Sequence, residues 1–203
     1  MNKANKGEKM KKGAQDDSRE NKQIEVFHLS GTGGRSNKYL HDAECVVDKK
    51  TYKIELKSCA SSKNQVSTSR QFSLKKIEEW KRNDCFIFSR WDDSKESVHF
   101  IEHVFCTPAM LEPFFKKVAK KLNAGIAGRA GLGDWERAKQ VLLENNLHKE
   151  AKKLEGTILI GVALNDPRIS WKNIKLWGIQ INNSEPDKHL RQLLNKHNHK
   201  EEK

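Results

Sequence analysis

Alternating apolar and polar side chains predict two neighbouring strands early in the chain. Successive side chains of a strand point to opposite faces, so residues two apart share a face. Residues 51–58 have an apolar face of Tyr52, Ile54 and Leu56, and a charged face of Lys53, Glu55 and Lys57. Residues 39–47 show the same alternation, with Asp42 and Glu44 on the polar face. The polar residues 48–51 predict a turn centred on Lys49 and Lys50, and therefore an antiparallel hairpin.

Other apolar patterns predict the rest of an α/β fold in which a mixed sheet is flanked by helices. The further strands are predicted at residues 85–91, 98–105, 157–164 and 174–181. The helices are predicted from Leu74, from Thr107 to about residue 122, from Asp134, and around Leu190, Leu193 and Leu194.

The polar face of the hairpin suggests a metal site. With the turn centred on residues 49–50, Asp42 is expected opposite Lys57, and Glu44 opposite Glu55. Two opposed carboxylates repel each other, and a divalent cation such as Mg²⁺ would remove that conflict. Lys57 adds a positive charge of the kind that stabilises negative charge on an attacked phosphodiester. The alternative interpretation is the exposed, charged face of an ordinary hairpin.

These residues resemble the motif of the PD-(D/E)xK nucleases, a family that includes most type II restriction endonucleases. The match consists of Asp42 followed, thirteen residues later, by Glu55-Leu56-Lys57, with His41 at a position where the family often has proline. The resemblance implies a restriction-endonuclease-like α/β core in which Asp42 and Glu55 bind Mg²⁺. It implies that Lys57 orients or activates the attacking water and steadies the scissile phosphate. Glu44 is the alternative first metal ligand, because it shares the predicted face.

The charge of the chain indicates a polyanionic partner. There are 39 Lys and Arg against 27 Asp and Glu, which gives a formal net charge of +12. Such an excess favours nucleic acid, here duplex DNA. Arg35 and Lys38, before the hairpin, are candidate contacts to the DNA backbone, and Ser69, Arg70 and Gln71, after it, are candidate contacts to bases. The second group has equally the chemistry of a solvated loop.

Length and composition predict one compact domain with a tail at each end. We expect a disordered basic arm over residues 1–23, a nuclease domain over 24–183 and a C-terminal helix or tail over 184–203. Residues 24–30 form a short apolar element, and since some members of the family that the motif resembles carry an additional acidic ligand on a helix against the sheet, the resemblance makes Glu25 a further candidate ligand. No apolar run approaches the ~20 residues that span a bilayer, so we expect a cytoplasmic protein without a membrane partner. The four cysteines include no C-x-x-C pair and are expected to be free thiols.

The expected function is that of a Mg²⁺-dependent type II restriction endonuclease that cuts duplex DNA at a short sequence. A palindromic target would require a homodimer, and a restriction–modification system would supply a partner methyltransferase. One alternative is a junction resolvase or repair nuclease of the same fold that recognises DNA shape. Another is a basic nucleic-acid-binding protein without catalysis.

Overall fold

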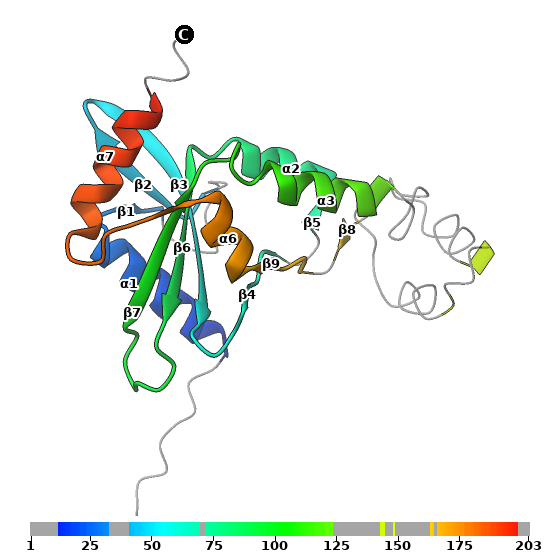
Figure 1. Ribbon diagram of the computed structural model, residues 1–203, viewed down its shortest axis with the longest axis horizontal. Coiled ribbons are helices and arrows are strands. Elements are labelled where there is room, and N and C mark those ends of the chain that lie inside the picture. Colours follow the sequence, from blue (N-terminus) through cyan, green and yellow to red (C-terminus); the bar gives the residue numbers. More distant parts are fainter. Residues whose placement is uncertain are drawn as a thin grey trace, which may run out of the picture.

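A six-stranded mixed sheet forms the centre of the computed structural model, with helices on both faces (Figure 1). The structure describes residues 12–32, 41–69, 72–123, 143–144, 148, 163–164 and 166–198. The sheet order is β1-β2-β3-β6-β7-β10. Its strands are β1 (Ser30–Gly31), β2 (Ala43–Val47), β3 (Lys50–Ala60), β6 (Cys85–Trp91), β7 (Phe100–Cys106) and β10 (Ile179–Gln180). The predicted α/β class with a mixed sheet flanked by helices is therefore confirmed.

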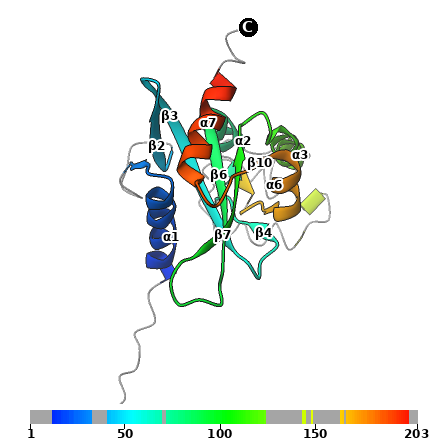
Figure 2. The ribbon, with the colours of Figure 1, turned by 60° about the vertical axis from the view of Figure 1, so that its left-hand side comes forward.

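Two hydrophobic cores lie on opposite faces of this sheet (Figure 2). One face is covered by α1 (Lys12–Val26) and α7 (Pro186–Asn198), which pack on Ile54, Leu56 and Ile87. The other face is covered by α2 (Leu74–Lys81), α3 (Glu112–Asn123) and α6 (Trp171–Trp177). Two short strand pairs, β4 (Gln65–Val66) with β9 (Ile169–Ser170) and β5 (Phe72–Ser73) with β8 (Ala163–Leu164), lie beside this second core.

The central strand β3 pairs in parallel with β6, and α2 forms part of the crossover between them. In this register Glu55 lies beside Phe86, and Lys57 beside Phe88. Both phenylalanines belong to the core under α2 and α3. The charged face of β3 therefore points toward α2, and a charged pair lies next to buried aromatic rings.

The β2–β3 hairpin has a tighter turn than the sequence predicts. Asp48 and Lys49 both have positive φ, 48° and 67°, which is the backbone of a type I′ two-residue turn. Val47 therefore pairs with Lys50, and Glu44 with Lys53, so the predicted pairs Asp42–Lys57 and Glu44–Glu55 are wrong by two residues. An even slip keeps every side chain on its predicted face. Continuing the observed register places Asp42 opposite Glu55.

Several other predicted elements are confirmed or corrected. The strand at 85–91 and the helix from Leu74 are confirmed, and the helix predicted from Thr107 begins later, at Glu112, because the preceding residues form a turn. The strand predicted at 174–181 is wrong over its first half, where α6 continues to Trp177, but Ile179–Gln180 form β10 and pair with β7. Ser170 caps this helix by accepting a hydrogen bond from the Asn173 amide, which favours a helix over an extended strand. Most of 157–164 and the helix predicted from Asp134 lie outside the described residues.

The N-terminal helix corrects a second prediction. The disordered arm predicted over residues 1–23 is wrong from Lys12 onward, because α1 begins there. Gln23 and Phe27 anchor the end of this helix and are 1% and 0% exposed. Two buried anchors stabilise a helix that composition alone does not reveal. At the other end of the chain, the predicted terminal helix is confirmed as α7, with Leu190, Leu193 and Leu194 in the core.

A close approach of α6 to β7 depends on one glycine. A Cβ atom on Gly178 would lie 2.5 Å from Cγ1 of Val104 and 2.6 Å from Sγ of Cys106. Only glycine, which has no Cβ atom, fits at position 178. The four cysteines are buried and free, as predicted. None of the helices that the structure describes is both long and apolar enough to cross a membrane.

Candidate active site

Three predicted residues converge on the central strand. The ammonium of Lys57 lies 2.6 Å from Oε1 of Glu55 and 3.2 Å from Oδ2 of Asp42. It also donates a hydrogen bond of 2.9 Å to the carbonyl oxygen of Leu56. Three oxygen atoms therefore surround a single cationic group. The tighter hairpin register makes this cluster possible, because it brings Asp42 level with Glu55.

Backbone contacts fix the position of Asp42. Its Oδ2 atom accepts a hydrogen bond of 2.8 Å from the amide of Leu56 in the neighbouring strand. The hydroxyl of Thr32 donates to the carbonyl oxygens of His41 and Asp42, at 2.7 and 3.0 Å. The first acid is thus held from both sides just before β2 begins, and Glu55 lies in the middle of the sheet.

Burial and charge determine the protonation of the cluster. Glu55 is only 6% exposed, and burial raises the pKa of its carboxyl group. Burial alone would lower the pKa of Lys57, but the negative charges of Glu55 and Asp42 outweigh it and raise that pKa. The lysine is consequently protonated at neutral pH. Its ammonium lies 5.9 Å from the centre of the Trp80 ring, which faces it from α2.

The oxygen set suits a hard divalent cation. Carboxylate and carbonyl oxygens with water are the ligands that Mg²⁺ prefers, and one or two carboxylates are enough when phosphate oxygens complete the shell. Asp42, Glu55 and the carbonyl of Leu56 direct such oxygens at one point. In this structure the ammonium of Lys57 lies at that point and supplies the positive charge. Within the described part of the chain, no group of three His, Cys, Asp or Glu side chains suits a metal ion. Two side-chain ligands are therefore what this cluster offers.

The two alternative acids are placed elsewhere. Glu44 lies opposite Lys53 and its Oε1 is 2.9 Å from Nε2 of His41, so the structure places Asp42, and not Glu44, against Lys57. Glu25 is exposed on α1, where it pairs with Lys22 at 2.8 Å. Because α1 covers the opposite face of the sheet from Glu55, Glu25 does not join the cluster.

The predicted DNA contacts are mostly outside the described residues. Arg35, Lys38, Arg70 and Gln71 fall there. Ser69 is described, and its carbonyl accepts a hydrogen bond of 3.1 Å from the amide of Asp166. The carboxylate of Asp166 in turn accepts hydrogen bonds from the two residues before Ser69, at 3.0 and 2.8 Å. This polar segment therefore holds the chain around residue 166 in place.

A buried polar network behind β3 is absent from the sequence prediction. The amide of Gln23 donates to Oγ of Ser89 at 2.7 Å and lies 3.4 Å from the carbonyl oxygen of Lys57. Oγ of Ser89 lies 2.8 Å from Nδ1 of His103, and burial lowers the pKa of His103 to about 4. The signal in the sequence is a polar residue among the apolar positions of each of two strands, Ser89 in β6 and His103 in β7. This network ties α1 to the strand that carries the cluster.

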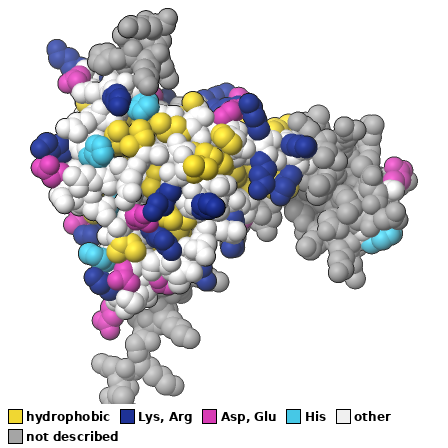
Figure 3. Space-filling view, viewed as in Figure 1, with side chains coloured by type: hydrophobic (Ala, Val, Ile, Leu, Met, Phe, Trp, Pro, Cys, Tyr) yellow, Lys and Arg dark blue, Asp and Glu magenta, His cyan; other side chains and the backbone are white. Residues whose placement is uncertain are grey.

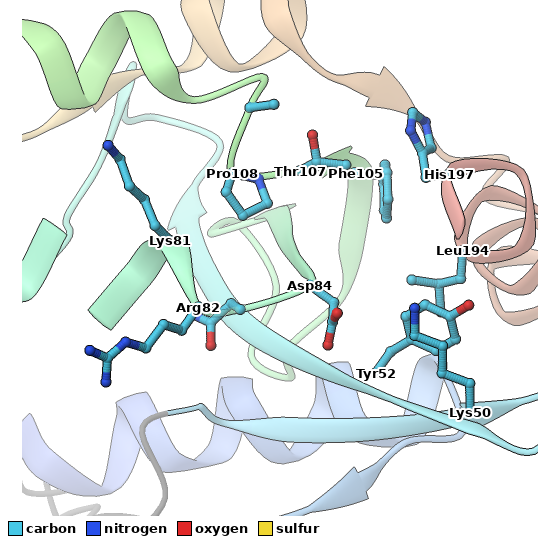
Figure 4. A pocket seen from close by; sticks show the side chains of 12 residues that line it. Lys50, Tyr52, Lys81, Arg82, Asp84, Phe105, Thr107, Pro108, Leu194 and His197 are labelled. Carbon is cyan, nitrogen blue, oxygen red and sulfur yellow. The ribbon is translucent and has the colours of Figure 1, made fainter. Parts of the chain in front are cut away.

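A separate pocket lies at the end of the sheet where β3 and β6 begin (Figure 4). Its volume is about 540 Å³, and Asp42, Glu55 and Lys57 are not among its lining residues. Its walls are apolar at Tyr52, Phe105, Pro108 and Leu194, with Lys50, Lys81, Arg82 and Asp84 among the polar residues. Figure 4 shows Lys81 and Arg82 on one side and Lys50 on the other. Basic residues outnumber acids in this lining, whereas the oxygen cluster has two acids and one lysine.

Neither a scan of the chain against protein-family models nor a search of curated proteins finds a match.

Proposed function

We propose that the chain is a Mg²⁺-dependent endodeoxyribonuclease with a restriction-endonuclease-like core, and specifically a type II restriction enzyme. The observation that carries this proposal is the convergence of Asp42, Glu55 and the Leu56 carbonyl on the ammonium of Lys57. The mixed sheet with helices on both faces agrees with the fold that the resemblance implies. The sequence motif and the spatial cluster consist of the same residues, which favours a site over a merely solvated hairpin face.

Each residue has a distinct role in this proposal. Asp42 and Glu55, with the Leu56 carbonyl, hold Mg²⁺, which when bound supplies Lewis-acid stabilisation and an activated water. Lys57 neutralises charge on the scissile phosphate. Its positive charge, which the carboxylates of Glu55 and Asp42 favour in this structure by raising its pKa, is of the kind that stabilises negative charge on an attacked phosphate. Trp80 limits the directions in which the lysine can turn.

The partner in this proposal is duplex DNA. The net charge of +12 supports a polyanionic substrate. Recognition of a palindromic sequence would involve a homodimer, with each subunit cutting one strand, and a methyltransferase would protect the host DNA. The chemistry at Asp42, Glu55 and Lys57 is the same for a resolvase or a repair nuclease, so the substrate distinguishes these enzymes.

The test is a cleavage assay on unmethylated phage DNA with Mg²⁺, and with EDTA as the metal-free control. The Lys57→Ala variant removes the proposed phosphate-binding charge, and Lys53→Ala is its matched control, because Lys53 is an exposed lysine of the same strand. We expect discrete fragments from the wild type and Lys53→Ala, and none with EDTA or Lys57→Ala.

Other outcomes point to the alternatives. Cutting of a four-way junction but not of linear duplex would indicate a resolvase. DNA that is bound in EDTA, and by Lys57→Ala, but never cut would contradict the nuclease proposal and favour a non-catalytic DNA-binding protein.

A further inference from the structure

One side of α3 carries a dense row of lysines. Lys116, Lys117, Lys120 and Lys121 are all exposed. Their spacing along the chain places them on one side of the helix, because residues four apart are neighbours on a helical surface. The opposite side is apolar and packs into the core with Phe114, Phe115, Val118 and Leu122. The four lysines are called the lysine face of α3 below.

Among the residues that the structure describes, no acid pairs with these four lysines. None of the four lysines forms an ion pair or a side-chain hydrogen bond with any residue that the structure describes. The one acid of α3, Glu112, lies in the first turn and pairs with Lys81 of α2 at 3.5 Å. Like charges four residues apart destabilise a helix. The C-terminal end of the helix dipole favours Lys120 and Lys121 but not the other two, so an external anion is the natural counter-charge.

The lysine face belongs to the helix layer that covers the candidate active site. The ammonium of Lys57 lies 5.9 Å from the ring of Trp80 in α2, and that ring lies 6.5 Å from the ring of Phe115 in α3. Two contacts thus connect the oxygen cluster to the buried side of α3, which is opposite the lysine face. Figure 3 shows Lys and Arg side chains gathered over α2 and α3.

The charge density of this face matches that of a duplex. Residues 116 to 121 span five helical steps of ~1.5 Å, or about 8 Å along the axis of α3. Duplex DNA carries one negative charge per ~1.7 Å of its axis, and therefore about four or five charges over the same length. We propose that the lysine face of α3 binds the phosphate backbone of duplex DNA, on the outer side of the helix layer that covers the candidate active site. The choice of DNA rests on the proposed function.

The test measures how DNA binding depends on salt, in EDTA so that no cleavage occurs. Anisotropy of a labelled duplex is followed from about 50 to about 200 mM KCl. The variant K116Q/K117Q/K120Q/K121Q is compared with K49Q/K172Q/K188Q/K196Q, which removes the same charge from exposed lysines of other elements. Each lost phosphate contact lowers the slope of log K against log salt by about 0.9. We expect the slope of log K against log salt to fall by about three in the α3 variant, and its affinity for DNA to fall at least about tenfold. In the control variant the slope should fall by less than about one.

Two outcomes overturn the inference: an equal loss of slope in both variants, or an unchanged slope in the α3 variant. Circular dichroism checks the fold of each protein, and K116Q/K117Q, which leaves the last turn intact, should show about half the effect if the larger variant does not fold. The result is independent of catalysis. If the slope falls in the α3 variant but the wild type shows no Mg²⁺-dependent cutting, DNA binding by the lysine face is supported and the nuclease proposal is refuted. If the wild type cuts DNA but the slope is unchanged in the α3 variant, the nuclease proposal stands and the lysine face is not a DNA-binding surface.

Discussion

Lowering the pH should weaken the fold through one buried histidine. His103 is 3% exposed, and its described contacts are neutral: the hydroxyl of Ser89 and the rings of Phe27 and Phe100. Oγ of Ser89 accepts a hydrogen bond from the Gln23 amide and lies 2.8 Å from Nδ1 of His103. Burial among these neutral groups disfavours the charged imidazolium and lowers the pKa of His103.

The size of the effect follows from the two pKa values. The imidazole has a pKa of 6.5 as an ordinary histidine and of about 4 in the folded protein. On acidification the unfolded chain takes up a proton first, so stability is fully present above pH 6.5 and falls between there and pH 4. The difference corresponds to a total of about 3 kcal/mol, of which about 2 kcal/mol is lost by about pH 5.

Urea denaturation at neutral pH and at about pH 5, compared between the wild type and His103→Asn, measures this loss. The asparagine side chain keeps a polar group near the position of Nδ1 and cannot be protonated. We expect the wild type to lose about 2 kcal/mol more than the variant over this interval. His99→Asn, at an exposed histidine of the same region, is the control and should follow the wild type. Parallel loss of stability in the wild type and His103→Asn would refute the reasoning.

Three further changes should alter stability, each measured by urea denaturation at neutral pH. Lys57→Met leaves buried Glu55 without its counter-ion and should lower the free energy of unfolding by about 3 kcal/mol. Adding Glu55→Gln should restore part of this loss, and a double variant whose loss equals the sum of the two single losses would contradict a coupled pair. Gly178→Ala forces a Cβ atom against β7 and should cost about 2 kcal/mol, whereas a neutral result would mean that α6 can shift. Replacing Asp48-Lys49 with Asn-Gly suits the positive φ angles and should stabilise by about 1 kcal/mol, and a loss would argue against the type I′ turn.

The sequence predicts the faces of strands better than their partners. Alternation correctly assigned Glu55 and Lys57 to the polar face of β3, because that assignment depends only on the two-residue period. The register depended on the turn, and Asp48-Lys49 gives no glycine signal for positive φ. For this reason Asp42 was expected opposite Lys57 and is instead level with Glu55.

Long-range packing explains the other differences. The segment 174–181 alternates like a strand, yet Trp171 and Ile174 are both buried three residues apart, and the Ser170 cap begins a helix. Helix α1 is held by Gln23, whose partners Ser89 and Ile87 are more than sixty residues away. Local patterns contain no information about such partners. Local patterns likewise do not reveal that the lysine face of α3 lies next to α2.

The hydrogen bonds of Thr32 fix both ends of the chain segment between β1 and β2. The Thr32 amide and hydroxyl hold the carbonyls of His41 and Asp42, so Thr32 fixes the position of Asp42 from the end of β1. Where both ends of a chain segment are fixed in this way, changes of length or sequence within it cost little. Evolution or protein engineering can therefore vary this segment, including Arg35 and Lys38, without displacing Asp42.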